Sequence, residues 1–206
     1  MRVRRLARRA AMSWPVIAAT VLLAGGVLIF GILGRPSPGT TSDTFWNSLW
    51  VNGTFQTYPD AGLAVDASDV VVVGRFASVD KGRTANAAPE LGPDGLLSFA
   101  KVRVKVEVVL AGSYTPNADG TLGLELFLPE ASALEVMVAN TPGERTLLFL
   151  RASPSGGNDA YALLNPEALV RDLPGSQTVS WAEEPWLLAL GRLPFDSVVD
   201  SVRAES

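Results

Sequence analysis

From Phe99 to Leu110 the sequence reads FAKVRVKVEVVL, and this stretch decides the fold. Between Lys101 and Val108 every odd position carries a charged residue and every even position carries valine. Side chains of a β-strand point alternately to opposite faces, so this pattern places the valines on one face and the charges on the other. One face therefore meets a core and the other meets water, which is typical of a strand in a half-buried antiparallel sheet.

Similar signals on both sides of this stretch predict further strands. Four consecutive valines at 70–73 are typical of a strand that is buried on both faces or belongs to a closed barrel. Gly74 after them indicates a bulge or a sharp coil of the strand. A turn is expected at 80–83. Strands are predicted at 70–79, 97–110, 121–128, 134–138, 145–150 and 161–164. Together with their turn-rich connections they predict a mainly β fold, either a small antiparallel β-barrel or a sandwich.

Two short helices are predicted at the C-terminal end. The first is expected from about Glu183 to Leu190, because Pro185 is tolerated only in the first turn of a helix. The second is amphipathic and is expected to pack against the barrel. Its apolar residues recur at helical spacing and are Phe195, Val198, Val199 and Val202.

The N-terminal region predicts a membrane anchor. Residues 1–13 contain five arginines and no acidic residue, and the 20 residues at 14–33 carry no charge. A helix of that length spans about 30 Å, the hydrocarbon thickness of a bilayer. The run is longer than the apolar part of a signal peptide and is not followed by a typical cleavage site, so an uncleaved single-pass signal anchor is expected at 14–34. A cleaved signal peptide and a buried core helix are the alternatives.

The charge asymmetry around this anchor predicts the orientation of the chain. Arginines precede the span, so the positive-inside rule places the tail at 1–13 in the cytoplasm and the bulk of the protein outside the plasma membrane. The lipid bilayer is then a partner of residues 14–33.

Residues 35–58 are expected to form a linker and juxtamembrane segment ahead of an extracytoplasmic β-barrel domain at 59–206. A single helical turn would gather the aromatic residues between Phe45 and Trp50, together with Leu49, on one face. Two hypotheses follow for this segment. It lies as an anchor in the outer headgroups of the membrane, or it packs onto the domain as an N-terminal strap.

The composition of the chain excludes several kinds of chemistry. It has no cysteine and no histidine, so it forms no disulfide, no zinc–thiolate site and no histidine-based catalytic triad. Residues 1–35 hold six of the 17 basic residues and none of the 21 acidic ones, which leaves the rest with a formal net charge of −10. An acidic domain of this kind repels phosphate backbones, and nucleic acid is not expected as a partner.

Three groups of polar residues qualify as candidates for chemistry, and each has a structural explanation. Asp196 and Asp200 lie four residues apart, on what would be the solvated face of an amphipathic helix. Glu183 and Glu184 suit the first turn of a helix because of its dipole. Residues 117–120 lack the loop of a calcium site and predict a tight turn. No catalytic residue, metal ligand or cofactor is therefore predicted.

Lys101, Arg103 and Lys105 form a basic stripe on an acidic domain and are the predicted interaction face. One interpretation is that the stripe receives an anionic polymer. The other, which we favour, is that it pairs with acidic residues of a neighbouring strand such as Glu125.

Three segments of the chain carry a resemblance to known proteins. They are Ser68-Asp69 with the following valines and Gly74, the run from Val102 to Gly112, and the run from Gly143 to Leu150. Over about residues 60–170 the chain resembles small secreted or membrane-anchored actinobacterial proteins that are largely uncharacterised. It is also similar to the OB-fold barrel of netrin-like and metalloproteinase-inhibitor-like modules. The resemblance implies an OB-like barrel. Those inhibitors use cysteines, including an N-terminal one that contacts the target's metal, so no inhibitory site is implied here.

These observations predict a non-enzymatic interaction module that is tethered to the outer face of a bacterial plasma membrane. It would bind a protein or cell-envelope partner through its barrel loops or through the Lys101, Arg103 and Lys105 face. Two other functions compete with this one. The chain is a structural accessory subunit that acts through residues 14–33, or it is an envelope-glycan hydrolase that uses a pair of carboxylates.

Overall fold

The computed structural model describes residues 41–49, 56–86, 96–153, 160–165, 169–173 and 185–206. Contacts group residues 38–206 into one unit. The predicted tail at 1–13 and the predicted anchor at 14–34 lie outside the described residues. Within the part of the chain that is described, no helix is both long enough and apolar enough to cross a bilayer.

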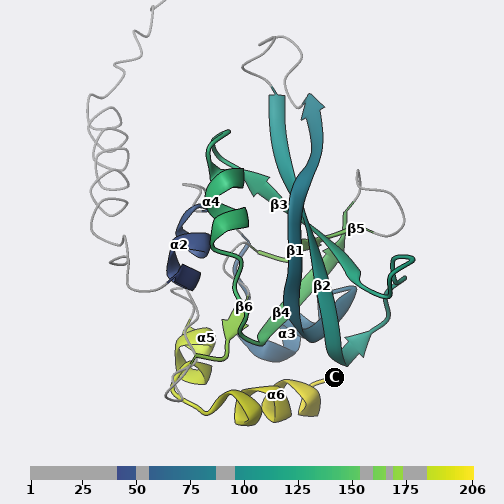
Figure 1. The fold of residues 1–206 in the computed structure, drawn as a ribbon. Coiled ribbons are helices and arrows are strands. Elements are labelled where there is room, and N and C mark those ends of the chain that lie inside the picture. Colours follow the sequence, from purple (N-terminus) through teal and green to yellow (C-terminus); the bar gives the residue numbers. More distant parts are fainter. Residues whose placement is uncertain (1–40, 50–55, 87–95, 154–159, 166–168, 174–184) are drawn as a thin grey trace, which may run out of the picture. The chain divides into compact units, whose positions relative to one another are not determined.

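Six strands form one mixed sheet, and five of them close into a ring (Figure 1). The strands are β1 (Val70–Asn86), β2 (Leu96–Gly112), β3 (Leu122–Leu128), β4 (Thr146–Ala152), β5 (Ala160–Leu163) and β6 (Leu169–Arg171). Their order is β1-β2-β3-β5-β4-β6, and a second pairing of β1 with β4 closes the ring. The prediction of a mainly β fold is confirmed.

The prediction of a wholly antiparallel sheet is wrong at one place, because β3 and β5 pair in parallel. The other pairs, β1–β2, β1–β4, β2–β3, β4–β5 and β4–β6, are antiparallel. Strand directions can alternate all the way around a closed ring only when the number of strands is even. A ring of five strands must therefore contain a parallel pair, which occurs where β5, the hairpin partner of β4, returns beside β3.

β1 and β2 form a long antiparallel hairpin that extends beyond the rest of the sheet (Figure 1). The expected turn at 80–83 is wrong, since these residues belong to β1. A Cβ atom at Gly82 would lie 2.7 Å from the carbonyl oxygen of Phe99, so this glycine serves the close approach of the two strands. The predicted bulge is confirmed by a register shift between Val73 and Gly74.

Two layers of apolar side chains pack on the two faces of the sheet. All five strands of the ring contribute to the first layer, which therefore fills the ring. The second layer lies between the other face of β1 and β4 and three helices. The four valines at 70–73 alternate between the layers and are at most 2% exposed, which confirms a strand that is buried on both faces.

The three helices of the second layer are α3 (Ala61–Asp66), α5 (Pro185–Leu190) and α6 (Phe195–Ala204). Both predicted C-terminal helices are thus confirmed. The apolar face of α6 is buried in the second layer, where the helix contacts β2 and α3. Its buried residues are Phe195, Val198, Val199 and Val202.

The segment at 134–138 was expected as a strand and is instead part of α4 (Ala133–Ala139). Its sequence, ALEVMVA, is a short apolar run of the kind that alternation alone cannot assign to helix or strand. Alanine, leucine, glutamate and methionine all favour helix, and the spacing of Ala133 and Met137 places both on the buried face. The helix connects β3 to β4.

Helix α2 (Thr41–Asn47) packs onto the domain through its aromatic residues. Phe45 is completely buried and Trp46 is 6% exposed, and both join the layer inside the ring. Their rings contact Phe76 of β1, with centroids 5.5 Å and 5.4 Å away. Of the two hypotheses for this segment, the strap that packs onto the domain is confirmed for Phe45, Trp46 and Leu49, while Trp50 lies outside the described residues.

We expect Phe45→Ala to lower the free energy of unfolding by about 3–5 kcal/mol, because it removes a buried ring and leaves a cavity. Leu63→Ala is the control, since Leu63 is 47% exposed and its truncation removes little buried area. Chemical denaturation of the two variants measures the difference. Equal stability of the two variants would show that α2 is not part of the core.

Gly112 and Gly120 allow a second stability comparison between two substitutions. Both glycines have positive φ angles, of 70° and 79°. A Cβ atom at Gly112 would lie 2.0 Å from the carbonyl oxygen of Asp69, whereas one at Gly120 would meet nothing within 4 Å. We expect Gly120→Ala to cost about 1–2 kcal/mol of stability through backbone strain alone. Gly112→Ala should cost clearly more, and thermal unfolding of both variants tests this order.

Candidate functional site

The predicted interaction face lies on the outer side of β2. Lys101, Arg103 and Lys105 are exposed, while Val102 and Val104 between them are buried inside the ring. The structure thus brings the three basic residues to one face, at the spacing that the alternation requires. In register, Lys101 lies opposite Asp80 of β1 and Glu125 of β3.

Only one residue of the basic stripe forms an ion pair with the described residues. Arg103 pairs with Asp119, which belongs to the turn before β3 and not to a neighbouring strand. Lys101 and Lys105 have no such partner within the described part of the chain. The expected pairing of the stripe with Glu125 is therefore wrong, because this carboxylate already binds another cation.

That cation is Arg83 of β1, which reaches across β2 to Glu125. Its Nε and Nη2 donate to the two carboxylate oxygens at 2.9 Å and 3.2 Å, in the bidentate geometry that a guanidinium favours over an ammonium. The hydroxyl of Ser153, at the end of β4, donates to Glu125 at 2.7 Å. The glutamate side chain is only 10% exposed, so its two oxygens are held inside this cluster.

Two phenylalanines complete the outer face beside this ion pair. The guanidinium of Arg83 lies 4.4 Å from the ring centroid of Phe99, and this ring contacts Phe127 edge-on at 6.0 Å. The cluster was not predicted. The sequence does contain a sign of it. Phe99 lies an even number of residues from the exposed charges of β2, and Phe127 lies two residues after Glu125, so each phenylalanine shares a strand face with those charges.

The turn at 117–120 is confirmed, and it holds Asp119 as an ionised group. The carboxylate accepts hydrogen bonds from the hydroxyl of Thr121 at 2.6 Å and from its backbone N–H at 3.1 Å. These bonds, with the help of Arg103, lower the pKa of Asp119 from 3.8 to about 2. Gly120 supplies the positive φ that the turn needs.

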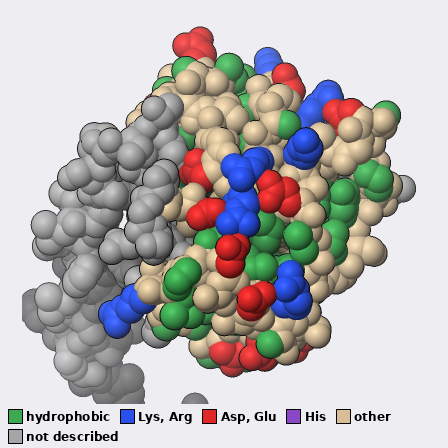
Figure 2. Space-filling view, turned by 60° about the horizontal axis from the view of Figure 1, so that its bottom comes forward, with side chains coloured by type: hydrophobic (Ala, Val, Ile, Leu, Met, Phe, Trp, Pro, Cys, Tyr) green, Lys and Arg blue, Asp and Glu red, His purple; other side chains and the backbone are tan. Residues whose placement is uncertain are grey.

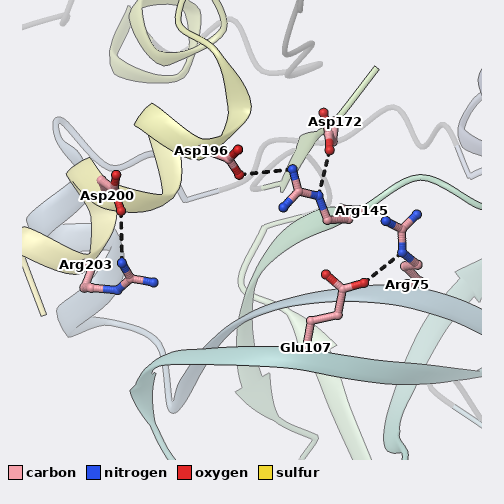
Figure 3. A network of polar contacts seen from close by, with 7 residues as sticks. All are labelled: Arg75, Glu107, Arg145, Asp172, Asp196, Asp200 and Arg203. Atoms are coloured by element: carbon pink, nitrogen blue, oxygen red, sulfur yellow. Dashed lines mark hydrogen bonds and ion pairs between the residues drawn. The ribbon is translucent and has the colours of Figure 1, made fainter. Parts of the chain in front are cut away.

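The structure does not bring Asp196 and Asp200 together as a pair of catalytic carboxylates. Asp196 binds Arg145 at 3.0 Å, while Asp200 binds Arg203 at 2.9 Å, and the two carboxylates point to different partners (Figure 3). The hydrogen bond from Arg145 to Asp172 raises the pKa of that arginine. Glu183 and Glu184 lie outside the described residues.

Within the described ranges, no group of three or more acidic residues could hold a metal ion. Comparison with protein-family models and with curated proteins finds no match for the chain. The site is therefore judged on its own geometry.

The depressed pKa of Asp119 has a measurable consequence. Since the folded pKa lies below the unfolded one, ionisation of Asp119 stabilises the fold above about pH 4, and this contribution is lost as the pH falls towards 2. We expect Thr121→Val to raise the pKa of Asp119 more than Arg103→Gln does, because the hydroxyl bond that it removes is the largest single cause of the lowered pKa. NMR titration of the carboxyl carbon measures both, and the reverse order would contradict this assignment.

Proposed function

We propose that this protein is a non-enzymatic interaction module, held outside the plasma membrane by a signal anchor at 14–34. It binds an acidic partner protein through the outer face of β2 and β3. The uncharged run at 14–33 and the arginines before it support the tether and its orientation. The absence of cysteine and histidine from the chain supports a role in binding.

The finer architecture that we propose is a small OB-like barrel. The closure of five strands by the β1–β4 pairing and the apolar layer that fills the ring support it. In barrels of this type, the face of the second and third strands is a common binding surface. The basic stripe and the two phenylalanines of the candidate site lie on the corresponding strands.

Lys101 and Lys105 are the observation on which the proposed function rests. They are exposed and have no ion pair to a described residue, although the domain has an excess of acidic side chains. The arginines around them are all neutralised by carboxylates, namely Arg75, Arg83 and Arg103. Unpaired cations of this kind give charge complementarity to an acidic surface and orient its approach.

The aromatic side of the same face supports a protein as the partner. Phe99 and Phe127 are partly buried, and Phe99 lies two residues before Lys101 on β2, with Arg83 stacked on its ring. Aromatic and arginine side chains are enriched at the centres of protein interfaces, where they supply contact area at low entropic cost. Acidic groups on a partner would meet the lysines, and its apolar groups would meet the rings.

A second candidate function is favoured by the uncharged run itself. In this case the chain is an accessory subunit that acts through residues 14–33 inside a membrane complex. Replacement of the run by an unrelated apolar span separates the two functions. Loss of function after this replacement, with an intact outer face, would favour the accessory subunit.

Charge reversal tests the proposed face directly. A photo-crosslinking side chain at position 127 of the full chain, irradiated in native membranes, should give a defined protein adduct. We expect Lys101→Glu with Lys105→Glu to reduce its yield by about tenfold, because like charges then face each other. Lys81→Glu is the control, since Lys81 is an exposed lysine of β1 outside the face. An adduct that survives the double reversal would contradict the proposal.

A further inference from the structure

An open pocket of about 400 Å³ lies apart from the aromatic face, beside β1. Its walls come from three places in the chain: β1, the residues just before β4 and the residues just after β6. The lining residues are Arg75, Glu144, Arg145, Asp172 and Leu173. Four of the five are charged, and both signs are present.

Arg75 is held at the pocket by two hydrogen bonds, and some of its N–H groups are not used by them. Its Nε donates to Glu107 at 2.8 Å, and its Nη1 donates to the carbonyl oxygen of Gly143 at 2.6 Å. A guanidinium has five N–H donors, so Nη2 retains both of its hydrogens without an acceptor among the described residues. In Figure 3 the terminal nitrogens of Arg75 point away from Glu107.

Arg145, another residue that lines the pocket, is also held in place by bonds of its guanidinium group. Its Nε donates to Asp172 at 2.7 Å and its Nη2 binds Asp196 at 3.0 Å, while the guanidinium lies 4.9 Å from the ring centroid of Phe195. Its Nη1 has no acceptor in the described part of the chain. Asp172 uses one carboxylate oxygen for Arg145, and its other oxygen accepts no hydrogen bond from the described residues.

The charges around the pocket nearly cancel. Two arginines, Arg75 and Arg145, form ion pairs with three carboxylates, which belong to Glu107, Asp172 and Asp196. Glu144 binds Arg171, which is fully buried. On the face shown in Figure 2, basic and acidic side chains alternate, and neither sign forms a continuous patch. A purely anionic or purely cationic ligand would therefore meet its own sign as well as the opposite one.

We propose that this pocket binds a small zwitterion, an amino acid or short peptide with a free carboxylate and a free ammonium group. The carboxylate accepts hydrogen bonds from Nη2 of Arg75 and Nη1 of Arg145. The ammonium donates to the free oxygen of Asp172, and Leu173 contacts the apolar part of the ligand. Because the ion pairs already hold these side chains, binding costs little reorganisation.

The test uses the full chain and three probes of similar size: glycylglycine, N-acetylglycine, which lacks the ammonium group, and glycylglycinamide, which lacks the carboxylate. Isothermal titration calorimetry should detect binding of the dipeptide and much weaker binding of the two singly charged probes. Each charge-assisted hydrogen bond contributes about tenfold to affinity. We therefore expect Arg75→Gln and Asp172→Asn each to weaken dipeptide binding by about tenfold or more.

Arg203→Gln is the matched control, because Arg203 pairs with Asp200 and does not line the pocket. It should leave dipeptide binding unchanged. Thermal unfolding of each variant verifies that it is folded. Undetectable binding of the dipeptide, equal binding of N-acetylglycine, or unchanged affinity in both pocket variants would each overturn the proposal.

Discussion

The pairing of β1 with β4 is the interaction on which the rest of the structure depends. Val70–Gly74 pair with β4 along one edge of β1 and with β2 along the other, so the strand has no free edge there. Closure removes an edge that would invite pairing with other chains, and it creates an interior for the leucines of β3. Val70 and Val72 point into the ring, whereas Val71 and Val73 point into the second layer. Each of these buried valines contributes about 1.5–3 kcal/mol to folding.

The odd number of strands in the ring has consequences for the candidate site. Because the other pairs of the ring are antiparallel, β5 must run parallel to β3. β5 lies between β3 and β4, so the end of β4 faces β3 across a single strand. Ser153 thereby reaches Glu125, a residue 28 positions earlier in the chain, and completes the cluster around Arg83. The geometry of the site is thus a result of ring closure as well as of the β1–β2 hairpin.

The difference between arginine and lysine explains how charge is distributed over the outer surface. The planar guanidinium forms bidentate or bridging bonds, and Arg75, Arg83 and Arg145 each use it to connect separate segments of the chain. An ammonium group gains less from such geometry and is more strongly hydrated. Lys101 and Lys105 consequently form no ion pair with a described residue. Arg75 lies opposite Lys105 in register, so the proposed interaction face and the pocket share one hairpin.

The sequence by itself determined the elements with clear periodicity: the alternating stretch at 99–110, the buried valines at 70–73 and the amphipathic α6. Each of these depends on one strand or helix with one buried side, which local spacing reveals. It did not determine the helix at 133–139 or the direction of β5. The first is a short apolar run that suits either helix or strand, and the second follows from the number of strands in the ring. Only the tertiary structure decided which acid each cation binds, because Glu125 goes to Arg83, a residue two strands away whose longer, forked side chain can reach it.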